Sequence, residues 1–224
     1  MYGKDKNTMT STSHRDNEAH ELNKLRPHLK PRSLYTFSPK KIDGVNNMTQ
    51  SKFSMKPKGM WFACGTDWLD FVSELEKGDA LYDKMSKYKY LYEINIDVKK
   101  VVKIRSLSGL VKFTKKYGFH GKPYVYKPLT SLIKTSDKRD THVDRYLYYI
   151  DWKRMENDGY CGIIICPSLV LQIHNAERLG NLNLSDSVFW YQGWDVASGV
   201  VWNTEALRST KLMFTKNNKG VWTK

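Results

Sequence analysis

The segment from 56 to 75, KPKGMWFACGTDWLDFVSEL, constrains the fold more than any other part of the chain. Its apolar run at 60–64 is too short for a buried helix and has the length of a buried strand. Gly65 interrupts the run, and Thr66 is a suitable N-cap for the helix that follows. The apolar positions of that helix recur at helical spacing: Trp68, Phe71, Val72 and Leu75. A strand, a glycine turn and a helix N-terminus can present backbone N–H groups to an anionic ligand, although a purely structural strand–helix unit is the competing interpretation.

Alternating apolar and polar residues, bounded by residues that interrupt regular structure, predict further strands and helices along the chain. Residues 88–97 alternate most regularly, with tyrosines and isoleucines on one face. The other predicted strands are 33–38, 101–104, 161–166, 200–202 and 211–215. The other predicted helices are 152–157, 168–180 and one that ends at 117 and is capped by Ser106 or Ser108. Because the helices are interleaved irregularly with the strands, we expect an α+β fold in a single domain with mixed or antiparallel sheets.

Polar segments predict the boundary of this domain and the position of one long loop. Residues 1–32 are predicted to be a basic, flexible N-terminal arm, in which only Leu22, Leu25 and Leu29 suggest a helical face. The α+β domain is then 33–224. Residues 119–140 are predicted to be a long basic loop, and Gly78 is predicted to cap the helix that begins near Asp67.

The charge favours a polyanionic partner. The chain holds 37 Lys and Arg against 23 Asp and Glu, a formal net charge of +14. An excess of this size is typical of proteins that bind nucleic acid, a nucleotide or an acidic protein surface. The residues expected to contact RNA or DNA phosphates are Lys24, Arg26, Lys30, Arg32, Lys122, Lys127, Lys134, Lys138 and Arg139.

Several classes of protein lack support in the sequence. No apolar run has the length of a membrane span, so we expect a cytoplasmic protein with no membrane partner. Cys64, Cys161 and Cys166 lie in or beside apolar strands and are predicted to be small buried hydrophobes. Neither they nor the six histidines have metal-ligand spacing, and we predict no metal. Signature motifs of NTPases, dinucleotide-binding domains, serine hydrolases and zinc proteases are missing.

Aromatic residues gather near glycines and single carboxylates. The dipeptide Trp194-Asp195 is followed by the small residues Ala197-Ser198-Gly199. A carboxylate next to an aromatic face, where the backbone is narrow, would suit a planar or cationic ligand. Core packing is the alternative explanation for most of these rings.

The order of these parts resembles the ADP-ribosyltransferase superfamily, in its branch with a His-Tyr-Glu type of site. The matching parts are a first strand at 34–38, a second strand with its glycine at 59–63, and a late acid near Asp195. Thr36 stands where the family has histidine, and Asp195 stands in place of glutamate, with Glu205 and Glu93 as other candidates. The strings KPKGMWF and WDVASGVVW are also similar to uncharacterised proteins of phages and large DNA viruses.

The resemblance implies an ADP-ribosyltransferase-like fold and a NAD-dependent mono-ADP-ribosyltransferase acting on a protein or nucleic acid. The implied acid hydrogen-bonds a ribose hydroxyl and stabilises an oxocarbenium-like centre as nicotinamide leaves. The residues it implies are Asp195, Glu205 and Tyr35 for catalysis, and Thr36, Gly59, Trp61, Trp68, Trp194 and Ser198 for NAD. The second hypothesis is a basic nucleic-acid-binding or interaction module with the same scaffold and no turnover.

Overall fold

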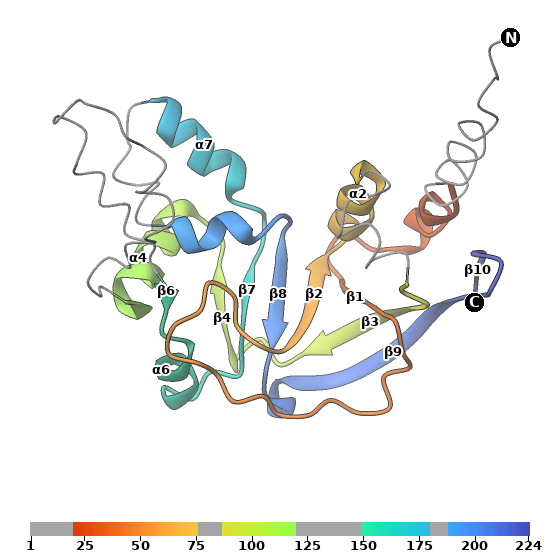
Figure 1. Cartoon of the computed structure of the whole chain (residues 1–224), viewed down its shortest axis with the longest axis horizontal. Helices are drawn as coiled ribbons and strands as arrows, with labels where there is room; N and C mark the ends of the chain where they lie inside the picture. Colours follow the sequence, from red (N-terminus) through yellow and green to blue (C-terminus); the bar gives the residue numbers. More distant parts are fainter. Residues whose placement is uncertain (1–19, 76–86, 120–148, 180–187) are drawn as a thin grey trace, which may run out of the picture.

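The computed structural model describes residues 20–75, 87–119, 149–179 and 188–224, which form an α+β fold around one mixed sheet of eight strands. Figure 1 labels most of its elements. In chain order they are η1 (Arg26–His28), β1 (Leu34–Ser38), β2 (Met60–Cys64), α2 (Asp67–Glu74), β3 (Tyr90–Ile96), β4 (Val101–Ile104), α4 (Leu107–Tyr117), β5 (Gly118–Phe119), β6 (Tyr149–Ile150), α6 (Trp152–Asn157), β7 (Gly162–Ile165), α7 (Val170–Arg178), η2 (Phe189–Gly193), β8 (Ser198–Val201), η3 (Thr204–Ala206), β9 (Leu207–Lys216) and β10 (Trp222–Thr223).

The large sheet bends at β1. Its strand order is β10-β9-β3-β1-β2-β8-β7-β4, and only the pair β4–β7 is parallel. Strand β1 pairs with β3 over five positions but with β2 over two. Figure 1 shows the consequence: β3 and β9 run at a steep angle to β2 and β8. Strands β5 and β6 form a separate two-stranded sheet.

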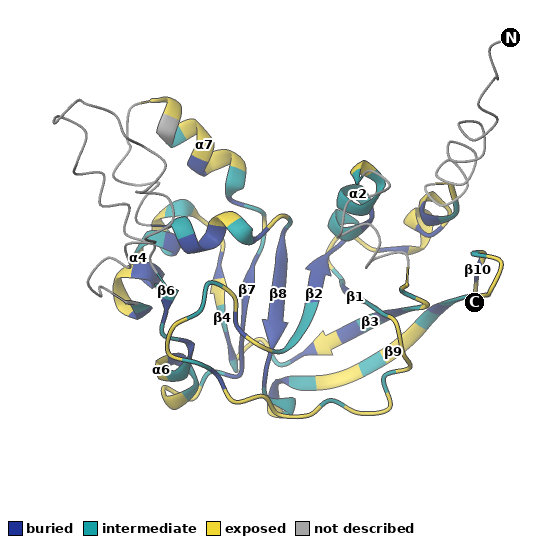
Figure 2. Ribbon diagram, viewed as in Figure 1, coloured by how far each residue is buried: buried dark blue, intermediate teal, exposed yellow. Residues whose placement is uncertain are grey.

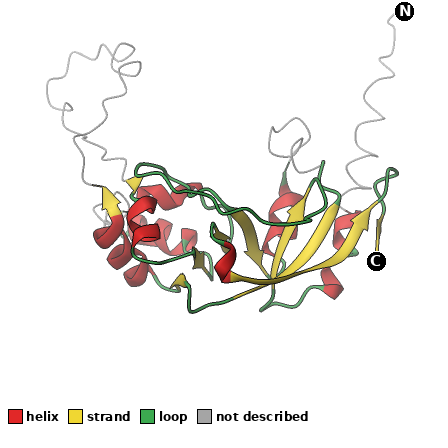
Figure 3. Ribbon diagram, turned by 90° about the horizontal axis from the view of Figure 1, so that it is seen from below, coloured by secondary structure: helices red, strands yellow, loops and turns green. Residues whose placement is uncertain are grey.

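Helices cover one face of the sheet in two groups (Figure 3). The larger group, α4, α6, α7 and η2, packs on β4, β7 and β8 around the buried rings of Trp152, Trp190 and Trp194. Helix α2 and the segment 20–29 pack on the β1–β3–β9 half. Figure 2 shows β7 and β8 buried along their length, while much of β9 is exposed. The larger helix group therefore stabilises the central strands, as expected for a layered α+β domain.

The opposite face holds a second apolar cluster between the two halves of the bent sheet. Phe62 and Val201 come from one half, and Tyr92 and Ile94 come from the other. All four side chains are less than 5% exposed. The bend therefore lets the sheet bury both of its faces.

Helix α2 is confirmed, but it differs in detail from the prediction. Thr66 makes no side-chain cap; its hydroxyl donates instead to Asp70 Oδ2 at 3.1 Å. The buried side chain of α2 is Leu69, at 1% exposure, whereas Trp68 and Phe71 are half-buried. The glycine turn is confirmed, since Gly65 has φ +58° and an added Cβ would lie 2.9 Å from the Pro31 carbonyl oxygen.

The described part of the N-terminal segment is packed rather than detached. Leu22, Leu25 and Leu29 are buried, and they contact a cluster that includes Tyr35 and Leu69. Within residues 20–32, the expectation of a flexible arm is therefore wrong. The physical reason is that these leucines share one helical face, and a buried sheet surface is available to cover it. Residues 1–19 lie outside the described part of the chain.

The remaining predictions concern single elements. The helix start predicted at Ser106 or Ser108 lies at Ser106, and the start predicted at Asp151 is confirmed, because the side chains of Ser106 and Asp151 accept hydrogen bonds from Gly109 N–H and Arg154 N–H. The last two predicted strands are longer than expected, beginning at Ser198 and Leu207. The cap at Gly78 and all but the first residue of the 119–140 loop lie outside the described residues. No helix in the described ranges is long and apolar enough to cross a membrane.

Candidate functional site

Strands β1, β2 and β8 lie side by side in the centre of the sheet. Strands β1 and β2 are two of the parts on which the family resemblance rests, and the third part, the late acid Asp195, precedes β8. Strand β2 pairs with β8 in an antiparallel register that sets Trp61 opposite Val200 and Ala63 opposite Ser198. Segments about 130 residues apart in the sequence are therefore neighbours, and the loop before β8 lies near β2.

Four residues form what we call the tryptophan–aspartate cluster: Lys56, Trp61, Trp194 and Asp195. The rings of Trp61 and Trp194 meet edge to face, with centroids 4.8 Å apart and planes at 63°. Lys56 Nζ lies 5.6 Å from the centroid of the Trp61 ring and 4.0 Å from Asp195 Oδ2. An ammonium group thus sits between an aromatic ring and a carboxylate, which is the arrangement of a cation-binding aromatic site.

The cluster is partly open to solvent. The side chains of Lys56 and Asp195 are each 47% exposed, and Trp61 is half-buried. Trp194 is 1% exposed, and its indole Nε1 has no hydrogen-bond partner among the described residues. A buried donor without a partner is uncommon, and the indole Nε1 of Trp222 is the other such atom among the described side chains.

Asp67 is a neighbour of this cluster that the sequence analysis did not select. Its Oδ2 accepts a hydrogen bond from the Ala197 backbone N–H at 3.2 Å, so that α2 holds the segment that follows Asp195. Burial raises the pKa of the Asp67 carboxyl, and the nearby charge of Asp70 raises it further. The sequence showed only an acid in the first turn of a helix, where a favourable charge–dipole interaction is sufficient explanation.

Three predicted site residues have structural roles. Tyr35 is 1% exposed, and its hydroxyl accepts from the Lys30 backbone N–H at 2.8 Å. Ser198 is 3% exposed and donates to the Val196 carbonyl at 2.9 Å. Thr36 donates to the Trp61 carbonyl at 2.7 Å. Because Tyr35 pairs with Ala63, the side chain of Thr36 lies on the sheet face opposite to Trp61.

Gly59 and Trp68, two further residues predicted to bind NAD, are not part of the tryptophan–aspartate cluster. Gly59 has φ +151°, and an added Cβ would lie 2.4 Å from the Val201 carbonyl oxygen. Glycine is therefore required there for the close approach of the chain to β8. Trp68 packs against Phe71 on α2, with ring centroids 6.1 Å apart, and remains half-buried.

The three candidate acids lie in three different places. Asp195 precedes β8, whereas Glu205 follows its other end, in η3. Glu205 pairs with Lys100 at 2.7 Å, and the hydrogen bond from Lys100 lowers the pKa of the Glu205 carboxyl. Glu93 lies in a hollow of about 450 Å³ on the β3–β9 half and accepts from the Ser33 hydroxyl at 2.8 Å. Of these three acids, only Asp195 belongs to the tryptophan–aspartate cluster, through its contact with Lys56.

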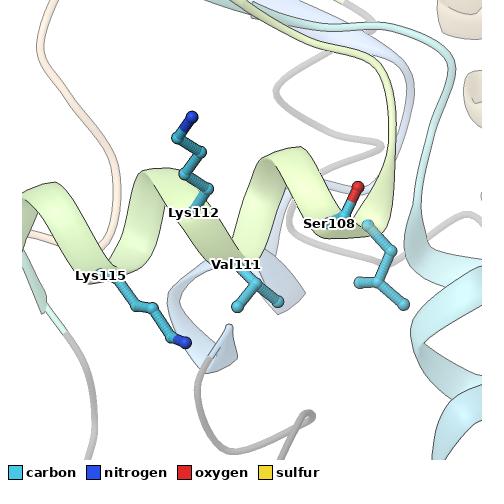
Figure 4. A pocket seen from close by; sticks show the side chains of 5 residues that line it. Ser108, Val111, Lys112 and Lys115 are labelled. Carbon is cyan, nitrogen blue, oxygen red and sulfur yellow. The ribbon is translucent and has the colours of Figure 1, made fainter.

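A second hollow, of about 500 Å³, lies along α4 (Figure 4). Its described lining is largely apolar and consists of Leu107, Ser108, Val111, Lys112 and Lys115. Figure 4 shows Lys112 and Lys115 leaving the helix in different directions. None of these described lining residues is an acid, a histidine or a cysteine, so the lining lacks the carboxylate and imidazole groups that serve as general bases near neutral pH.

Within residues 20–75, 87–119, 149–179 and 188–224, no three His, Cys, Asp or Glu side chains are placed to hold a metal ion together. In comparisons with models of protein families, with curated proteins and with solved structures, nothing matches the chain.

Proposed function

We propose that the protein is a NAD-dependent ADP-ribosyltransferase that modifies a protein or nucleic acid at the tryptophan–aspartate cluster. The observation that carries this proposal is the position of the Lys56 ammonium over the Trp61 ring and beside Asp195. In the free protein, Lys56 fills a place that suits a planar cation. The nicotinamide ring of NAD is such a cation.

The residues of the cluster have distinct roles in this proposal. NAD would supply an activated ribosyl group and nicotinamide as the leaving group. Trp61 stacks on the ring once Lys56 swings away, and Lys56 is long enough to reach a phosphate instead. Asp195 stabilises the positive charge that develops on the ribose as the bond to nicotinamide breaks. Asp67 positions the loop by holding Ala197 N–H.

Two further observations support the same site. The two strands of the family resemblance, β1 and β2, are neighbours in the sheet, and β8, which follows the late acid Asp195, pairs with β2. The buried N–H of Trp194 has no partner in the described part of the chain, and it belongs to the ring that packs edge to face with Trp61. Thr36 and Asp195 stand where the family has histidine and glutamate, and in this proposal Asp195 takes the role of the late acid.

The test is a titration of tryptophan fluorescence with NAD, followed by an assay of nicotinamide release. We expect saturable quenching, because Trp61 lies at the binding surface. The Asp195→Asn variant should keep the melting temperature and lose nicotinamide release by about 10²–10³-fold, the usual effect of removing one charge-stabilising group. Glu205→Gln is the matched control, since Glu205 lies at the other end of β8, and it should behave as wild type.

Two outcomes would contradict the proposal. If the wild-type protein does not bind NAD, the cluster is not a NAD site. If Asp195→Asn releases nicotinamide at the wild-type rate, Asp195 is not the acid. If Glu205→Gln loses activity instead, the catalytic acid is Glu205 in η3.

A non-catalytic nucleic-acid-binding module is the second candidate. The observation in its favour is the connection between β1 and β2, where Phe53 is 53% exposed and Lys40, Lys41, Lys52 and Lys58 are exposed. Exposed aromatic and basic side chains together are what single-stranded nucleic acids bind. RNA binding by a protein whose fluorescence does not respond to NAD would favour this candidate over the transferase.

A further inference from the structure

The hollow of about 450 Å³ on the β3–β9 half lies at the start of β1. Strand β1 begins at Leu34, which pairs with Ile94 of β3. Strand β3 continues to Ile96, so Asn95 and Ile96 have no partner among the described residues of β1. The end of β3, the turn that leads into β1 and residues of β9 line the space that this difference leaves. Its volume is within the range of roughly 300–1,000 Å³ that is usual for small-molecule pockets.

Four polar side chains share one face of the sheet in this hollow. In the register of β3 with β9, Glu93 lies opposite Lys211 and Asn95 lies opposite Ser209. Opposite residues project from the same face, and so do residues two apart along a strand. Leu91, which precedes Glu93 on this face, is buried, whereas Asn95 is exposed. The face therefore changes from apolar core to a polar surface along β3.

A tight turn holds Arg32 beside this face. The Ser33 N–H donates to the Lys30 carbonyl at 3.0 Å, which closes a four-residue turn with Pro31 and Arg32 at its central positions. The Ser33 carbonyl in turn accepts from the Gly65 N–H at 2.9 Å. The backbone of the turn is thus anchored to the start of α2, and Arg32 lines the hollow from its tip.

Positive charge predominates in the hollow. Its described lining holds two cations, Arg32 and Lys211, against one carboxylate, Glu93, which leaves a net charge of +1. Arg208, in the same strand as Lys211, pairs with Asp97 at 3.4 Å. By contrast, neither Arg32 nor Lys211 forms an ion pair with a described residue. A guanidinium and an ammonium group that are not already paired are the usual ligands of a phosphate in proteins.

Glu93 has one carboxylate oxygen available to a ligand. Its Oε1 accepts a hydrogen bond from the Ser33 hydroxyl at 2.8 Å, whereas its Oε2 accepts none from a described residue. An ionised carboxylate can only accept hydrogen bonds, so the ligand group beside Oε2 must be a donor. A phosphodiester has no donor, but a sugar hydroxyl is one. Asn95 and Ser209 can donate to or accept from further oxygens of such a ligand.

We propose that this hollow binds a ribose–phosphate unit, as found in an RNA strand or in a free ribonucleotide. Arg32 and Lys211 hold the phosphate, and Glu93 Oε2 accepts a hydrogen bond from a ribose hydroxyl. DNA lacks the 2′-hydroxyl, so the carboxylate distinguishes RNA from DNA. An acidic peptide would instead bring further carboxylates towards Glu93, which repels them. The proposal does not depend on NAD binding, and the hollow lies at the other end of β1 from the β1–β2 connection.

The experiment measures the binding of labelled oligouridine and oligodeoxyuridine of equal length to the full-length protein by fluorescence anisotropy. The two ligands differ only in the 2′-hydroxyl. We expect the RNA to bind about tenfold more tightly, the usual effect of one hydrogen bond to a charged group. Competition by UMP and dUMP distinguishes the two sources of the ligand. Displacement by UMP at lower concentration than by dUMP would support a free ribonucleotide, and RNA binding that neither displaces would support the strand.

Variants in the hollow separate its two functions. Glu93→Ala should lower the RNA affinity to the DNA value without weakening DNA binding, whereas a merely structural role of Glu93 would weaken both equally. Lys211→Gln should weaken the binding of both strands and make the log–log salt slope less steep by about 0.7. Lys103→Gln is the matched control, because Lys103 is an exposed lysine of β4, at the far edge of the same sheet, and it should bind as wild type.

Three results would overturn the proposal. The first is equal affinity of the wild-type protein for the RNA and the DNA, a measurement that needs no variant. The second is wild-type RNA binding by Lys211→Gln, which would place the RNA outside this hollow while leaving a nucleic-acid-binding function intact. The third is tighter binding of polyglutamate than of the RNA, which would assign the hollow to an acidic protein surface.

Discussion

Trp61 both packs against the core and lies at the surface of the proposed binding site. Its ring packs against the ring of Trp194, the Lys56 ammonium lies 5.6 Å from its centroid, and it is only half-buried. A residue of the core and a residue of a binding site respond differently to a small reduction in ring size. Phenylalanine keeps most of the apolar volume of Trp61 but has a smaller and weaker cation-binding face.

We therefore expect Trp61→Phe to weaken NAD binding by about two- to fivefold, which corresponds to the loss of roughly 0.5–1 kcal/mol of cation–π interaction. The melting temperature should barely change. Calorimetric NAD titrations and thermal unfolding measure the two effects on the same variant. Trp68→Phe is the comparison, since Trp68 packs on Phe71 outside the cluster. If Trp61→Phe lowers stability and leaves NAD affinity intact, Trp61 belongs to the core and the site lies elsewhere.

Among the elements, the segment 20–29 has an unexpected part in the fold. Its leucines pack on the same half of the sheet as α2, and Gly65 at the start of that helix lies against Pro31. The segment also pairs with α2 through Arg26 and Asp70. It therefore contributes to the position of α2, and through Asp67 to the loop that carries Asp195.

Leu25→Ala should reduce the free energy of unfolding by about 2–5 kcal/mol, because Leu25 is 1% exposed and alanine leaves a cavity. Urea denaturation measures the change. Asn23→Ala, at an exposed position two residues earlier, should stay within about 0.5 kcal/mol of wild type. Equal stability of Leu25→Ala and wild type would mean that this segment does not stay on the sheet in solution.

For the whole molecule, the net charge of +14 predicts salt-sensitive binding of nucleic acid. Ion pairing distinguishes the basic residues of the N-terminal segment. Lys24 pairs with Glu21 and Arg26 pairs with Asp70, whereas Lys30 and Arg32 have no ion pair with a described residue. The unpaired residues are the better candidates for phosphate contacts, since their charge is not already compensated.

RNA affinity should fall as salt rises, with a log–log slope of about −0.7 for each phosphate contact to a single strand. The double substitution Lys30→Gln with Arg32→Gln should make that slope less steep by roughly 1.4, which corresponds to two lost contacts. Lys24→Gln with Arg26→Gln removes the same charge and should change the slope less. Fluorescence anisotropy with a labelled oligonucleotide measures both. An affinity that does not depend on salt would argue against an electrostatic nucleic-acid site.

Local pattern was enough to predict most elements of this chain. The strand at 60–64, the alternation within 88–97 and the caps at Ser106 and Asp151 all reflect interactions between residues near in sequence. The role of the leucines at 22, 25 and 29 was not predicted, although their spacing was visible. Their burial depends on a sheet surface formed by residues far along the chain, and no local signal reports that surface.

The sequence by itself determined the α+β class, the glycine turn at Gly65 and the aromatic and acidic residues from which the candidate site is drawn. Only the tertiary structure decided which of these residues meet. The pairing of β2 with β8 brings Trp61 to Trp194 and Asp195, and separates that acid from Glu205. In the same way, the pairing of β3 with β9 sets Lys211 opposite Glu93. The physical reason is that strand order and register are selected by burial over the whole sheet, and a sequence pattern records only which face each residue takes.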